Sequence, residues 1–285
     1  AIRGAYVLLV EDNPFNQQVA TELLEDAGVI VCVANNGEEA LDLLQQEEFD
    51  CVLMDVQMPV MDGFEATRRI RLEPALGGLR VIAMTANAEP EDRVRCLAAG
   101  MDDFLTKPIL PDLLYATLAK WVAGRVCALA QQRTGERRTR AGRRARDRAP
   151  AATALRAVPI AATPKANDPA IIDLTVLARM VGNDPAKIRK FALKFLTSAQ
   201  EGLDEIQAAL ARKDMAAVAA LGHRIKSPAK TVGALGFAEL CQTLEQCKHA
   251  ADAEQAQSIL SQLYSLLAQI RMQTETSFPG QSSPR

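Results

Sequence analysis

The sequence predicts two domains of different fold class: an α/β domain with a doubly wound, five-stranded parallel sheet, followed by an all-α four-helix bundle. Over residues 1–124, short aliphatic runs alternate with helical patterns, which is the order of a parallel sheet covered by helices on both faces. From Ile171 onward only helical patterns occur. An arginine-rich segment over residues 125–168 separates the two regions, so we expect two cores.

Strands of the first domain are expected where short aliphatic, often β-branched runs end at polar or turn residues. The expected strands are Tyr6 to Val10, Val29 to Val33, Cys51 to Met54, Val81 to Met84 and Asp103 to Leu105. The expected helices are Pro14 to Ala27, Gly37 to Gln46, Gly63 to Leu72, Glu89 to Ala99 and Pro111 to Val122. The nearly continuous aliphatic character of the strands is typical of strands buried on both faces.

Charge divides the chain at the same places. The net charge of −2 is made of −12 over residues 1–124, +8 over residues 125–168 and +2 over residues 169–285. The middle segment has little apolar surface to bury and many like charges, so it is predicted to be a flexible linker. A flexible chain of its 44 residues would reach roughly 35 to 40 Å.

The bundle is predicted over residues 169–275, with a disordered tail over residues 276–285. Asp184 and Pro185 form a helix start, with an acidic cap and proline in the first turn. Apolar residues then recur at helical spacing in four stretches: Ile188 to Leu210, Val218 to Ile225, Leu235 to Leu244 and Ile259 to Ile270. Four amphipathic helices with short links make a bundle, and a short leading helix from Leu174 to Val181 is expected to pack against one end.

Cysteine spacing and hydropathy predict where the chain resides. The six cysteines show no CxxC spacing, which is typical of reduced thiols in a cytosolic setting. No apolar stretch approaches the roughly 20 residues that span a bilayer, and no signal peptide opens the chain. We therefore expect a soluble, cytoplasmic piece, and the start at Ala1 without a methionine indicates an excerpt from a longer protein or a trimmed chain.

Polar residues follow four of the expected strands at the point where each strand ends. Asp55 ends one run, Glu11 and Asp12 follow another, and Thr85 and Lys107 follow two more. In an open parallel sheet these strand ends share one edge, where ligands bind. Three carboxylates there favour a hard cation such as Mg²⁺, with Lys107 and Thr85 available to a phosphoryl group that one carboxylate attacks.

These residues lie in strings that together resemble the receiver domain of response regulators, which has a flavodoxin-like sheet. The strings are Val10-Glu11-Asp12-Asn13, Met54-Asp55 with Met58-Pro59 and Met61-Asp62-Gly63, Thr85-Ala86, and Lys107-Pro108. The resemblance implies that Asp55 accepts the phosphoryl group and that Glu11, Asp12, Asp55 and the backbone carbonyl of Gln57 hold Mg²⁺. It also implies that Thr85 and Lys107 stabilise the acyl phosphate. Phe104 matches the family's switch aromatic but lacks a hydroxyl, and helix capping alone would explain Asp62.

His223 is predicted to face away from the bundle core, toward solvent. Helical spacing places Val218, Leu221 and Ile225 on one apolar stripe and His223 on the opposite side. No residue at ligand spacing suggests a metal site, so the alternatives are a solvated surface histidine and a nucleophile. The small Ser227 and the cations Lys226 and Lys230 favour a nucleophile that receives an anion. His249 is expected to be a surface or loop residue.

The string from His223 to Ala234 resembles the histidine phosphotransfer (HPt) domain, a four-helix bundle with one phosphorylatable histidine. The resemblance makes His223 the phosphoacceptor, with Lys226, Ser227, Lys230 and Gly233 in support. Two positions depart from the family's pattern. Ser227 stands where glycine is usual, and Pro228 removes a backbone hydrogen bond to Arg224 and is expected to kink the helix.

Together the two resemblances imply the carboxyl-terminal part of a bacterial hybrid sensor histidine kinase, whose parent is a candidate for anchoring in the inner membrane. The expected phosphorelay runs from an upstream kinase histidine to Asp55, then to His223, then to a separate response regulator. No glycine-rich ATP-binding segment is visible, so kinase activity is assigned to sequence outside this chain. Two alternatives are a phosphate sink that drains the relay through Asp55, and binding of nucleic acid or an anionic surface by the basic linker, for which no recognition helix is visible.

Overall fold

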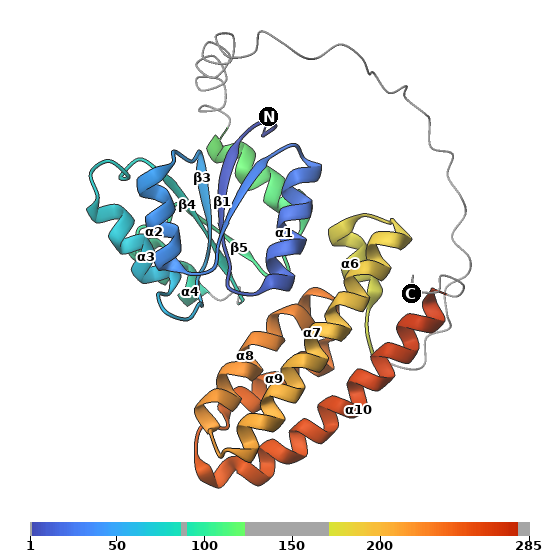
Figure 1. The fold of residues 1–285 in the computed structure, drawn as a ribbon. Helices are drawn as coiled ribbons and strands as arrows, with labels where there is room; N and C mark the ends of the chain where they lie inside the picture. Colours follow the sequence, from blue (N-terminus) through green and yellow to red (C-terminus); the bar gives the residue numbers. More distant parts are fainter. Residues whose placement is uncertain (1, 87–89, 123–170, 279–285) are drawn as a thin grey trace, which may run out of the picture.

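The computed structural model describes residues 2–86, 90–122 and 171–278. The first domain has a five-stranded sheet in the order β2-β1-β3-β4-β5, and every neighbouring pair is parallel (Figure 1). The strands are β1 (Tyr6–Val10), β2 (Ile30–Ala34), β3 (Cys51–Asp55), β4 (Arg80–Thr85) and β5 (Asp103–Thr106). The helices are α1 (Pro14–Asp26), α2 (Gly37–Gln46), α3 (Gly63–Leu72) and α4 (Pro90–Ala98), with a further helix over residues 111–122.

Alternate residues of the sheet face two separate apolar clusters, which confirms the doubly wound α/β class. Val7 and Leu9 of β1 pack toward α1 and the helix over residues 111–122. Leu8 and Val10 of the same strand pack toward α2, α3 and α4. Burial on both faces explains the unbroken aliphatic runs.

The strand limits differ from the predicted ones by single residues, for backbone reasons. The N–H of Val29 bonds to the carbonyl of Leu24 at the end of α1, so β2 begins one residue later, at Ile30. At their carboxyl ends, β3 and β4 each extend one residue beyond the prediction, to Asp55 and Thr85, because the ladder pairing continues through them.

The second domain is helical, as predicted. Its long helices are α7 (Pro185–Ala211), α8 (Met215–Thr231), α9 (Leu235–Gln246) and α10 (Ala253–Ser277), and α6 (Leu174–Val181) precedes them. Phe191, Phe195, Phe237 and Leu263 are fully buried between these helices. In Figure 1, α6 lies at the end of the bundle that is close to α1 of the first domain.

The end of α10 differs from the predicted bundle end at residue 275. The hydroxyls of Thr276 and Ser277 bond back to the carbonyls of Met272 and Gln273, so the helix continues to Ser277. The predicted linker lies outside the described residues, as do residues 279–285 of the predicted tail. No helix within the described ranges is long and apolar enough to cross a bilayer.

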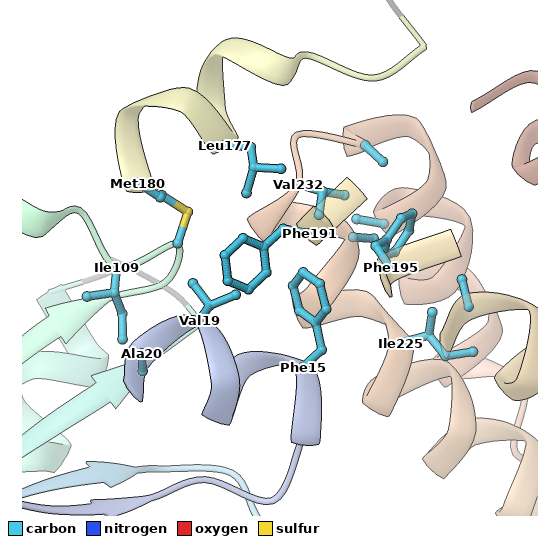
Figure 2. Packing of buried hydrophobic residues seen from close by; sticks show 14 of the residues in the cluster. Phe15, Val19, Ala20, Ile109, Leu177, Met180, Phe191, Phe195, Ile225 and Val232 are labelled. Atoms are coloured by element: carbon cyan, nitrogen blue, oxygen red, sulfur yellow. The ribbon is translucent and has the colours of Figure 1, made fainter. Parts of the chain in front are cut away.

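The two domains are packed against each other through one continuous apolar cluster. Phe15 of α1 lies edge-on to Phe191 and Phe195 of α7, with ring centroids 6.1 and 6.4 Å apart (Figure 2). Val19 and Met180 lie beside this aromatic group in the same view. Aromatic pairs in this geometry stabilise a contact beyond the area they bury.

Candidate functional site

The polar residues at the strand ends meet at the edge of the sheet that the sequence predicts. The ammonium group of Lys107 lies 2.6 Å from Oε2 of Glu11 and 2.5 Å from Oδ2 of Asp55. One carboxylate oxygen from each of Glu11, Asp12 and Asp55 lies within 4.8 Å of the others. Three carboxylates and one ammonium group, contributed by three strand ends, therefore form one cluster.

Close backbone packing holds Asp55 in this cluster. A Cβ atom on Gly63 would lie 2.1 Å from the carbonyl oxygen of Asp55, so only glycine allows α3 to begin so close to β3. Asp62 caps α3 by accepting a hydrogen bond from the N–H of Glu65 at 2.8 Å, as the sequence indicates. The N–H of Gln57 donates to Oδ1 of Asp55 at 3.2 Å, which places residue 57 directly beside the carboxylate.

Burial dominates the electrostatics of the cluster. Burial raises the pKa of Glu11 to about 6, even though Lys107 opposes the shift. Burial also raises the pKa values of Asp55 and Asp12. For Lys107 burial acts in the opposite sense, but the two carboxylates outweigh it and raise its pKa, so the ammonium group stays protonated. Three carboxylates against one ammonium group leave an excess of negative charge, which favours binding of a cation.

Thr85 and Phe104 lie on the side of the cluster nearer β4 and β5. Thr85 is buried and lines, with Asp12 and Gln57, a cavity of about 580 Å³. The ring of Phe104 is partly buried and lies 5.3 Å from the guanidinium carbon of Arg93. Thr85 thus lines the same cavity as Asp12, whereas Phe104 lies on β5 opposite Ala83, and the roles of both residues remain predictions.

His223 lies across from the cluster, on α8 of the bundle. It lines the cavity that Thr85 also lines, and it shares a smaller cavity of about 30 Å³ with Asp55 and Lys107. Its side chain is 33% exposed and points away from the bundle core, as helical spacing predicts. The side chain thus keeps part of its surface exposed, but that side of α8 also faces the first domain, which a helical wheel of one element does not include.

Glu245 on α9 is a partner of His223 that the sequence did not indicate. Its Oε1 lies 2.6 Å from Nδ1 of His223, and its Oε2 accepts a hydrogen bond from Lys226. Burial raises the pKa of Glu245, but the bonds to Lys226 and His223 outweigh that effect and lower it, so the carboxylate is ionised. An ionised carboxylate can only accept, so Nδ1 carries a proton, and in the tautomer that this bond selects the lone pair lies on Nε2.

The remaining predicted residues of the bundle have different surroundings. Lys226, Ser227 and Lys230 all line the small cavity beside His223, and Lys226 is also mostly buried in its ion pair with Glu245. Gly233 has φ of 80°, and a Cβ atom there would lie 2.3 Å from the carbonyl oxygen of Asp173. Gly233 therefore supports the site indirectly, by letting the end of α8 pack against the start of α6. His249 is exposed after α9, as predicted.

Comparison with known proteins identifies both halves. Residues 7–119 match the model of the response regulator receiver domain, and residues 190–273 match that of the Hpt domain. This chain joins a receiver domain to an Hpt domain. Such a pair belongs to phosphorelay signal transduction, which confirms the class of function that the sequence predicts.

Several of the similar curated proteins are much longer sensor kinases. The receiver half is 45% identical over 122 residues to sensor protein GacS of Pseudomonas syringae pv. syringae, covering 42% of this chain and 14% of that protein. It is 42% identical over 119 residues to hybrid signal transduction histidine kinase I of Dictyostelium discoideum, covering 39% and 7%. The chain therefore spans a small fraction of these two relatives.

Among solved structures, the receiver domain of sensor histidine kinase PA1611 from Pseudomonas aeruginosa PAO1 is 41% identical to the receiver half. The match covers 42% of this chain and 98% of that one, with a TM-score of 0.40. That receiver domain was crystallised with a magnesium ion coordinated in its active site cleft.

Polar contacts join the receiver domain to the Hpt domain around the aromatic cluster. Three polar residues of α1 contact three lysines of α7, in opposite order along the two helices. The pairs are Asp26 with Lys187, Glu22 with Lys190, and Gln18 with Lys194. Nearer the site, Nδ2 of Asn13 donates to the carbonyl oxygen of Arg224, and Nδ2 of Asn16 donates to Oγ of Ser227. The sequence did not indicate this interface, because both residues of each contact have the pattern of ordinary surface or capping residues in their own helices.

Proposed function

We propose that this chain transfers a phosphoryl group between Asp55 of the receiver domain and His223 of the Hpt domain of the same molecule. The observation that carries the proposal is that both side chains line one small cavity together with Lys107. The apolar cluster around Phe15 supports it, because a packed interface positions reacting groups without the entropy cost of a bimolecular encounter.

The transfer needs a lone pair on the histidine and a stable leaving carboxylate. Nε2 of His223 attacks phosphorus, the Nε2–P bond forms, and the bond between phosphorus and the Asp55 oxygen breaks. Its electron pair returns to the Asp55 carboxylate, beside the ammonium group of Lys107. The Nδ1 proton stays on its hydrogen bond to Glu245, which stabilises the positive charge that the ring acquires. The reverse step uses the same atoms, so the geometry serves transfer in either direction.

The acidic cluster fits Mg²⁺. Glu11, Asp12 and Asp55 offer clustered carboxylate oxygens, and the backbone carbonyl of Gln57 is the fourth ligand that we propose. When bound, Mg²⁺ supplies positive charge to the phosphoryl oxygens. Thr85 and Lys107 are proposed to stabilise the acyl phosphate on Asp55, and Phe104 to adjust to it.

The proposed route runs from the histidine of an upstream kinase to Asp55, then to His223, and then to the receiver of a separate response regulator. The hybrid kinase relatives support an upstream kinase core in the same parent chain. A cytoplasmic site of action is part of this proposal.

Labelled acetyl phosphate tests the transfer in the full chain. Asp55 would be labelled first as an acyl phosphate, which alkali cleaves, and His223 later as a phosphoramidate, which alkali leaves intact. Asp55→Asn is expected to abolish both labels, and His223→Gln to abolish only the alkali-stable one. An unchanged alkali-stable label in Asp55→Asn would refute transfer from Asp55 to His223.

A phosphate sink is a second candidate. The 580 Å³ cavity beside the acidic cluster gives water access to the site, which favours hydrolysis of a phosphoryl group returned to Asp55. Loss of label from His223 as free phosphate in the absence of any regulator would favour a sink. Retention of the label until a regulator receiver is added would favour forward relay.

A further inference from the structure

We propose that Pro228 creates a docking acceptor on the Hpt domain, by freeing the backbone carbonyl of Arg224 for the amide of Asn13 in the receiver domain. The proposal rests on the transfer function above and names what selects the receiver. The favoured partner is a receiver whose first helix begins with an Asn-x-x-Asn sequence, as this chain's own receiver does at Asn13 and Asn16.

The first step concerns the helix itself. Pro228 lies inside α8, which continues to Thr231. Proline has no N–H, so position 228 cannot donate to the carbonyl of Arg224, its partner four residues earlier in a regular α-helix. A carbonyl of α8 one residue beyond His223 is therefore released from the helix ladder at that position.

The second step is that the receiver domain supplies a donor to this carbonyl. Nδ2 of Asn13 donates to the carbonyl oxygen of Arg224 at 3.0 Å. Oδ1 of the same side chain caps α1 by accepting from the N–H groups of Phe15 and Asn16, at 2.9 and 3.2 Å. The capping bonds fix the orientation of the amide, so its Nδ2 points outward to the bundle. Asn13 is buried at this interface, where an unpaired carbonyl would be costly.

The third step is a matching contact one helical turn away. Nδ2 of Asn16 donates to Oγ of Ser227 at 3.0 Å and to Oε1 of Glu11 at 2.9 Å. The two asparagines are three residues apart on α1, and their acceptors, at Arg224 and Ser227, are three residues apart on α8. Both departures from the usual Hpt pattern, Ser227 and Pro228, thus provide acceptors for the same receiver helix.

The consequence is a fixed register between the two reacting groups. Asn13 directly follows Asp12 of the acidic cluster, and Arg224 directly follows His223. One hydrogen bond therefore joins the neighbour of a proposed metal ligand to the neighbour of the phosphoacceptor histidine. A receiver without a donor at position 13 would bury the Arg224 carbonyl unpaired, so the bond discriminates between partners.

The test uses full chains and labelled acetyl phosphate with Mg²⁺. Pro228→Ala restores the N–H that pairs the Arg224 carbonyl within α8, and Asn13→Ser keeps the α1 cap but removes the amide donor. Pro185→Ala, at the exposed first turn of α7, and Asn36→Ser, at the cap of α2, are the matched controls. The Asn36 control keeps a helix cap that lies away from the Hpt domain.

We expect Pro228→Ala to slow transfer from Asp55 to His223 about fivefold, the loss of one net hydrogen bond. Its melting temperature should rise, because alanine repairs the helix, so a merely structural role would not produce both changes. In the double variant Asn13→Ser should slow transfer no further. A rate for Pro228→Ala within twofold of the parent chain, or full additivity of the two losses, would overturn the proposal.

A second measurement does not depend on chemistry. Hydrogen exchange of the α1 backbone in the unphosphorylated chain should become faster in Pro228→Ala, although the substitution lies in the other domain. Unchanged exchange in α1 would overturn the proposal even in a chain that transfers no phosphoryl group. Failure of the proposed function is separate, since it would show as absent transfer in the parent chain itself.

Discussion

The acidic cluster and the histidine site are built in different ways. Asp55 is 5% exposed, and the charged groups that it contacts all lie at strand ends of the receiver domain. His223 is held by a second helix of its own bundle, through Glu245, and meets the cluster only across a domain interface. The position of the Asp55 carboxylate therefore depends on sheet topology, whereas that of the His223 ring depends on packing between helices and between domains.

Removing the cation of the cluster should have the largest effect. Lys107→Gln leaves Glu11 and Asp55 facing each other without an ammonium group, and we expect transfer between Asp55 and His223 to fall about a hundredfold. The rate is measured with labelled acetyl phosphate. Lys120→Gln, which removes an exposed lysine paired with Asp103, is the control and should leave the rate unchanged. A rate near that of the parent chain would show that the cluster needs no fixed charge from the protein.

The corresponding change on the histidine side should be smaller. Glu245→Ala removes the acceptor that keeps the proton on Nδ1, and we expect about a tenfold slower gain of label by His223. Glu245→Gln keeps an acceptor and should recover part of the rate, with a shifted pH profile. Equal rates for the two variants would show that Glu245 only packs against the ring.

Binding of Mg²⁺ at the acidic cluster should depend on pH. Burial raises the pKa of Glu11 to about 6, so below that pH its carboxylate takes up a proton that a divalent cation must displace. Below pH 6 the affinity for Mg²⁺ should therefore fall as the pH falls, and the fall should approach about tenfold per pH unit. Above pH 6 the affinity should be constant. Calorimetric titration with Mg²⁺ across this range measures the effect. A pH-independent affinity would contradict a buried, protonatable ligand.

The outer contacts of the interface should matter least. Glu22 and Lys190 form a partly exposed ion pair, so Lys190→Glu should slow transfer only about twofold, and less at high salt. Combining it with Glu22→Lys should restore the rate. A loss as large as that for Pro228→Ala would show that the register of docking is set by the charged rim.

The acidic half of the site could be predicted to a large extent, because the local sequence pattern indicates where each strand ends. An aliphatic run of five residues followed by a carboxylate indicates both a buried parallel strand and a polar group at its carboxyl end. Thr85 and Lys107 were found by the same reasoning, whereas Gln57 was implied only by the resemblance to receiver domains. Glu245 was missed because nothing in α9 marks it: it is one of several polar residues beside the buried Cys241 and Leu244.

What the sequence alone determined is therefore the two fold classes, the order of the elements, the acidic edge and the face of α8 that carries His223. These depend on periodicity and on capping, which act over a few residues. Only the tertiary structure decided that His223 faces the receiver domain, that Glu245 holds its ring, and that Asn13 meets the carbonyl beside it. Such contacts join residues that lie far apart in the chain, at 211 positions for Asn13 and Arg224. They are set by shape and unpaired polar groups, which no local pattern records.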